Sequence, residues 1–111
     1  MIYKIDLNND SNDEFEKNAD NTVEIQIFNK AGEDITKDLT VNMYLSKNGL
    51  IGLGTELIRL AHHFKEGKHM HLEPSEENRQ VQKMGVFLTP ESGKLTILCN
   101  HNKHIDDYFS E

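Results

Sequence analysis

The sequence predicts an α+β fold in a single domain over residues 1–111. It is expected to be a mostly antiparallel β-sheet of about five to six strands, covered on one face by a single long helix over about residues 47–66. Apolar residues recur at helical spacing only between residues 46 and 67, whereas on either side they alternate with polar residues as in half-buried strands. The links between these segments are short, which favours antiparallel neighbours in the sheet.

The predicted helix has one apolar face, and we expect its leucines to lie in the core. Ser46 or Asn48 can cap its start, and Gly67 suits the left-handed position after its last turn. Gly49, Gly52 and Gly54 each cost about 1 kcal/mol relative to alanine inside a helix. They therefore indicate either a close approach of the helix to a sheet or a frayed first turn. The apolar face consists of Leu50, Leu53, Leu57, Leu60, Ala61 and Phe64.

Six segments alternate as strands do. In the second of them, Val23, Ile25 and Ile27 are expected to point inward. Residues 29–34 have turn composition, and Pro90 to Gly93 is a strong turn signal that predicts a β-hairpin between the last two strands. The expected strands are residues 2–7, 22–28, 39–45, 68–73, 84–89 and 94–100, with an acidic loop over about 8–21 and a flexible tail over about 101–111.

The face of the sheet away from the helix would be polar and could serve as a docking surface. It would carry Lys4, Glu24, Gln26, Asn42, His69, His71 and Thr96.

The composition argues against several classes of protein. Nineteen acidic and twelve basic residues give a formal net charge of −7, which repels phosphate backbones and disfavours a nucleic-acid partner. No segment approaches the roughly 20 apolar residues of a membrane span. Cys99 is the single cysteine and cannot form an internal disulfide, so a reducing cytoplasm is the expected compartment.

The acidic charge is concentrated near the start of the chain. Residues 1–34 hold nine acids and three bases, and most of these acids lie in the loop of residues 8–21. Such a loop can attract and orient a basic protein partner. The residues expected to bind that partner are Asp10, Asp13, Glu14, Glu16 and Asp20.

Catalytic and metal-binding patterns are weak in this chain. His69 and His71 share one face of a predicted strand, and Glu73 continues that face, a spacing that is compatible with a metal site. We nevertheless expect a solvent-facing strand with surface histidines. Cys99 belongs to the inward set of a strand and is expected to be a buried, inert core residue, although His101 follows on the same face. We therefore expect no catalytic residues, no metal and no cofactor.

One stretch resembles small immunity proteins of bacterial polymorphic-toxin systems. In that pattern a strand leads through a Ser-x-x-Gly-Leu start into a leucine-rich helix, followed by a strand that carries His-x-His-Leu. The resemblance covers about thirty of the 111 residues and implies a non-enzymatic cytoplasmic inhibitor, which binds a cognate toxin domain, often a nuclease, and blocks its active site. The residues that carry it are Leu45, Ser46, Gly49, Leu50, Leu53, Leu57, Leu60, Ala61, His69, His71 and Leu72.

Two other functional hypotheses are compatible with the sequence. A small metal-binding protein or metal-dependent enzyme would use His69 and His71 with Glu73 or His62. A dimeric adaptor domain would pair through a sheet edge or through the exposed sheet face. The sequence does not determine the oligomeric state.

Overall fold

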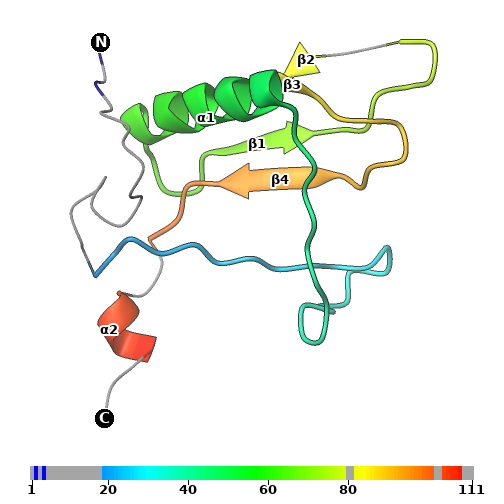
Figure 1. Ribbon diagram of the computed structural model, residues 1–111. Coiled ribbons are helices and arrows are strands. Elements are labelled where there is room, and N and C mark those ends of the chain that lie inside the picture. Colours follow the sequence, from blue (N-terminus) through cyan, green and yellow to red (C-terminus); the bar gives the residue numbers. More distant parts are fainter. Residues whose placement is uncertain (1, 3, 5–18, 80–81, 102–103, 109–111) are drawn as a thin grey trace. The chain divides into compact units, whose positions relative to one another are not determined.

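The computed structural model describes residues 2, 4, 19–79, 82–101 and 104–108. By their contacts, residues 37–101 form one compact unit, and residues before 37 group with those after 101 in a second unit. The first unit holds helix α1 (Lys47–His62) and strands β1 (His69–Leu72), β2 (Gln82–Lys83), β3 (Val86–Phe87) and β4 (Leu95–Leu98) (Figure 1). One long helix and small antiparallel sheets confirm the α+β class.

Helix α1 begins where the sequence predicts and ends earlier. The Ser46 side chain accepts a hydrogen bond from the Gly49 N–H at 3.0 Å, which confirms Ser46 as the cap. The helix ends at His62 rather than near residue 66, and His63 is its C-cap. Gly67 does adopt a left-handed conformation, with φ of 87°, but it lies in the turn that leads into β1.

The core is smaller than the leucine pattern predicts. Its buried centre consists of Leu53 from α1, Leu72 from β1 and Met84 from the β2–β3 turn. Leu57 was expected in the core and is 40% exposed. The sheets beside α1 have only two strands each, so they offer too little apolar surface to bury the whole leucine face.

Strand β4 pairs with β1, and the predicted hairpin between residues 84–89 and 94–100 is wrong. Its turn does form, because the Ser92 N–H donates to the Thr89 carbonyl oxygen at 3.0 Å. The antiparallel register nevertheless joins Met70 to Ile97 and Leu72 to Leu95. This pairing places four apolar side chains on one face, where they pack in or against the core cluster.

Strands β2 and β3 form a tight hairpin that the sequence analysis missed. Both residues of its two-residue turn have positive φ, 54° at Met84 and 73° at Gly85, as a type I′ turn requires. Methionine rarely adopts this conformation, and here the burial of its side chain in the core offsets the strain.

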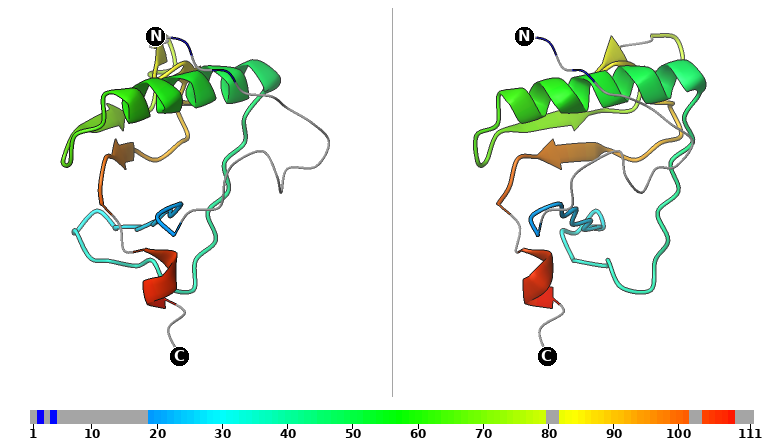
Figure 2. Two further views of the ribbon diagram at one scale, coloured as in Figure 1. Left: turned by 90° about the vertical axis from the view of Figure 1, so that its left-hand side faces the viewer. Right: turned by 60° about the vertical axis from the view of Figure 1, so that its left-hand side comes forward.

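The same turn explains Gly52. A Cβ built on Gly52 would overlap the carbonyl oxygen of Gly85, and it would lie 3.3 Å from the Gly85 Cα. At Gly52 the helix therefore does approach a sheet closely, through the turn that joins β2 and β3, and these strands lie beside the N-terminal half of α1 (Figure 2). Gly54 has nothing near its Cβ position, and nothing in the structure explains why it is glycine.

Two further predicted strands are absent from the described residues. Residues 22–28 contribute only an isolated bridge between Phe28 and Asp34, and residues 39–45 form no strand. Val23 and Ile25 were expected to point inward but are 86% and 56% exposed. Of the strand expected over residues 2–7, only residues 2 and 4 lie within the described part.

The second unit contains the predicted turn of residues 29–34 and the short helix α2 (Ile105–Tyr108). The Ile35 N–H donates to the Ile27 carbonyl oxygen at 2.8 Å, and the Asn29 side chain accepts from the Ala31 and Glu33 N–H groups. An asparagine bonded in this way to the backbone ahead of it is typical of tight turns. The turn is therefore specified locally.

Candidate functional site

The face of the β1–β4 pair away from the core carries two histidines and a threonine. Side chains alternate across the two strands, so Met70 and Leu72 face the core while His69 and His71 lie on the opposite face. The register places His69 opposite Leu98 and His71 opposite Thr96. Three of the residues expected on an exposed sheet face, His69, His71 and Thr96, are therefore brought together.

The two imidazole rings lie in edge-to-face contact and each is oriented by a hydrogen bond. Their centroids are 4.8 Å apart with an interplanar angle of 69°. His69 Nδ1 lies 3.0 Å from the Gly67 carbonyl oxygen, and His71 Nδ1 lies 2.9 Å from Thr96 Oγ1. The contact with Thr96 could not be found from the sequence, because it depends on the pairing of β1 with β4.

Glu73 continues this face and is paired. Its carboxylate lies 3.3 Å from the Lys94 ammonium, and both side chains are more than half exposed. Within the described ranges, no group of three or more histidine, cysteine, aspartate or glutamate side chains is placed to hold a metal ion. The histidine pair thus stands as a two-residue cluster.

Most of the predicted partner-binding residues lie outside the described part of the chain. These are Asp10, Asp13, Glu14 and Glu16. Asp20 is described and exposed, in a turn where the Thr22 N–H donates to its carbonyl oxygen at 2.7 Å.

The division into two units separates the charge of the chain more sharply than the linear sequence does. Residues 1–36 with 102–111 hold twelve acids and four bases, a net of −8, whereas residues 37–101 hold seven acids and eight bases, a net of +1. Together these make the −7 of the whole chain. Asp106 and Asp107, exposed in α2, belong to the same unit as the acidic N-terminal third, although they lie far from it in the sequence.

Asp34 is the titratable side chain with a shifted pKa among the described residues. The Thr36 hydroxyl, and then the Thr36 backbone N–H, donate hydrogen bonds to its carboxylate and hold the pKa below its ordinary value of 3.8. Because both bonds come from a residue two positions ahead, this is a local feature of the turn.

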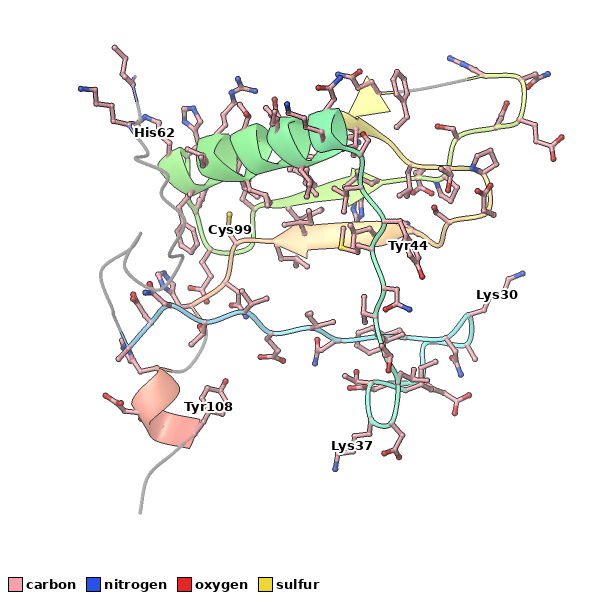
Figure 3. All side chains as sticks on the ribbon, viewed as in Figure 1. Lys30, Lys37, Tyr44, His62, Cys99 and Tyr108 are labelled. Atoms are coloured by element: carbon pink, nitrogen blue, oxygen red, sulfur yellow. The ribbon has the colours of Figure 1, made fainter. Side chains whose placement is uncertain are left out.

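Cys99 is a core residue, as predicted. It is 5% exposed and directly follows β4, where Figure 3 labels it. Its backbone N–H donates to the Lys68 carbonyl oxygen at 2.8 Å, which extends the β1–β4 ladder by one residue. The His101 ring contacts Phe64, with centroids 5.1 Å apart.

None of the helices in the described residues has both the length and the apolar character needed to cross a membrane. Comparison with models of known protein families, with curated proteins and with solved structures yields no match for this chain.

Proposed function

We propose that this chain is a non-enzymatic immunity protein, which acts in the cytoplasm by binding and neutralising a cognate toxin domain. The observation that carries the proposal is the separation of charge: a near-neutral unit with the helix and paired strands, and a second unit with a net charge of −8. The resemblance of residues 43–74 to immunity proteins supports the same conclusion.

The expected partner is a basic protein surface, such as the phosphate-binding cleft of a nuclease. Long-range attraction between opposite charges raises the association rate and orients the partner before contact. The acidic residues 10–20 provide the densest set of carboxylates in the chain, and Asp20 is exposed. The proposal assigns the first contact to Asp10, Asp13, Glu14, Glu16 and Asp20.

The test is the association rate with a toxin domain encoded beside this gene, measured against ionic strength. In one variant, the five carboxylates of the assigned contact are changed to Asn or Gln. We expect slower association, a flatter salt dependence and weaker protection of cells that express the toxin.

A matched control changes five exposed acids of the other unit and removes the same net charge. These are Asp38, Glu66, Glu76, Glu77 and Glu91. We expect this control to retain most of the wild-type rate and slope, because attraction depends on where the charge lies. Equal effects of the two variants would place the contact elsewhere, and the absence of binding by the wild-type chain to any neighbouring gene product would reject the immunity function.

A further inference from the structure

The histidine pair on β1 has a ring arrangement that its sequence spacing does not reveal. The Gly67 carbonyl oxygen can only accept a hydrogen bond, so the proton of a neutral His69 lies on Nδ1 and the lone pair lies on Nε2. In His71, Nδ1 is likewise engaged, with the Thr96 hydroxyl. When that hydroxyl accepts, the lone pair of His71 also lies on Nε2.

This is the arrangement that metal-ligating histidines adopt. A ligating imidazole almost always donates its other ring N–H to a carbonyl, carboxylate or similar acceptor, which fixes the ring and raises its basicity. Here the Gly67 carbonyl oxygen is such an acceptor for His69, and the Thr96 hydroxyl can accept from His71. The two ring centroids lie 4.8 Å apart on the same face of one strand. The Nε2 atoms are left as the coordinating nitrogens.

We propose that His69 and His71 chelate a divalent transition metal through their Nε2 atoms. Imidazole ligands suit Zn²⁺, Ni²⁺ and Cu²⁺ rather than Mg²⁺ or Ca²⁺. Two protein ligands leave the remaining coordination positions to water. Glu73 is held by Lys94 and is not required as a third ligand. This inference does not depend on the proposed function.

Thr96 acts as a positioning residue in this proposal. Its hydroxyl holds the His71 ring from the neighbouring strand, and it is a β-branched residue on a strand, so Thr96→Val preserves shape and strand preference while removing the hydrogen bond. Loss of an outer partner of this kind typically weakens metal affinity by about 10–100-fold. Because this site is half exposed, we expect Thr96→Val to weaken metal affinity by about tenfold, the lower end of that range.

The experiment is calorimetric titration of the untagged chain with Zn²⁺, accompanied by paramagnetic resonance of the Cu²⁺ form. We expect one ion per chain and nitrogen hyperfine structure from two imidazoles. His69→Asn with His71→Asn should abolish the site, and Thr96→Val should weaken it about tenfold.

The chain offers a matched control in its other histidine pair. His62 and His63 also lie edge to face, with centroids 4.9 Å apart, at the C-terminal end of α1. His62→Asn with His63→Asn should leave Zn²⁺ affinity unchanged. Affinity that survives the His69/His71 variant, or that is lost in the His62/His63 control, overturns the proposal.

A measurement on the wild-type chain keeps the test valid if the double variant does not fold. Nitrogen-15 spectra of the imidazoles should show Zn²⁺ shifting the Nε2 resonances of His69 and His71, with their Nδ1 atoms remaining protonated or hydrogen-bonded. Shifts confined to other histidines, or no shift at all, would also overturn the proposal.

Discussion

Gly52→Ala is expected to destabilise the protein although alanine is the better helix former. The substitution gains about 1 kcal/mol of helix propensity. The new Cβ would overlap the Gly85 carbonyl oxygen and lie 3.1 Å from its carbonyl carbon. Overpacking costs about 1–3 kcal/mol, and the upper value applies here because a backbone cannot rotate away as a side chain can. The expected net loss is therefore about 2 kcal/mol of unfolding free energy.

Gly54→Ala is the matched control, two residues along the same helix. Nothing lies within 4 Å of its Cβ position, so it should gain up to about 1 kcal/mol. Urea denaturation followed by helical circular dichroism should separate the two variants by about 3 kcal/mol. If Gly52→Ala proves as stable as Gly54→Ala, the contact between α1 and the Met84–Gly85 turn does not exist in solution.

Further predictions test the core and the hydrogen bonds between Asp34 and Thr36. Leu72→Ala should cost about 2–5 kcal/mol because Leu72 is 1% exposed, whereas Leu57→Ala should cost about 1 kcal/mol at 40% exposure; equal losses in denaturation would contradict the assigned core. The bonds from Thr36 lower the pKa of Asp34, so the stabilisation they provide is present above about pH 4 and is lost as the pH falls through the folded-state pKa. A nuclear magnetic resonance titration should show the Asp34 carboxyl titrating below 3.8, and Asp34→Asn should remove the acid-induced shift of the Thr36 amide; titration at the ordinary value would refute the bonded turn.

Only part of each candidate site could be predicted from the sequence. His69 and His71 share a face because residues two apart on a strand always do, and that much could be predicted from their spacing. Their ring orientation could not, because it depends on Thr96, which is 25 residues away from His71 in the sequence. The acidic contact was assigned from local charge density alone, and that assignment stays a prediction.

Local interactions determined the elements that were predicted correctly. Ser46 caps α1 within four residues, the apolar period of the helix is set by 3.6 residues per turn, and Asn29 closes its own turn. Residues 68–73 alternate, so β1 was also predicted from the sequence. Each of these signals is complete within a short stretch of chain.

Only the tertiary structure decided which segments become neighbours. The Thr89–Ser92 turn is compatible with a hairpin, but β4 pairs with β1, and this pairing places Leu95 and Ile97 against the core cluster that contains Leu72. The two-residue β2–β3 turn requires positive φ at Met84, which methionine disfavours; only the tertiary structure shows that this side chain is buried and that Gly85 contacts Gly52. Sequence patterns describe one segment at a time, whereas strand partners and helix contacts depend on competition among all segments for the same limited core.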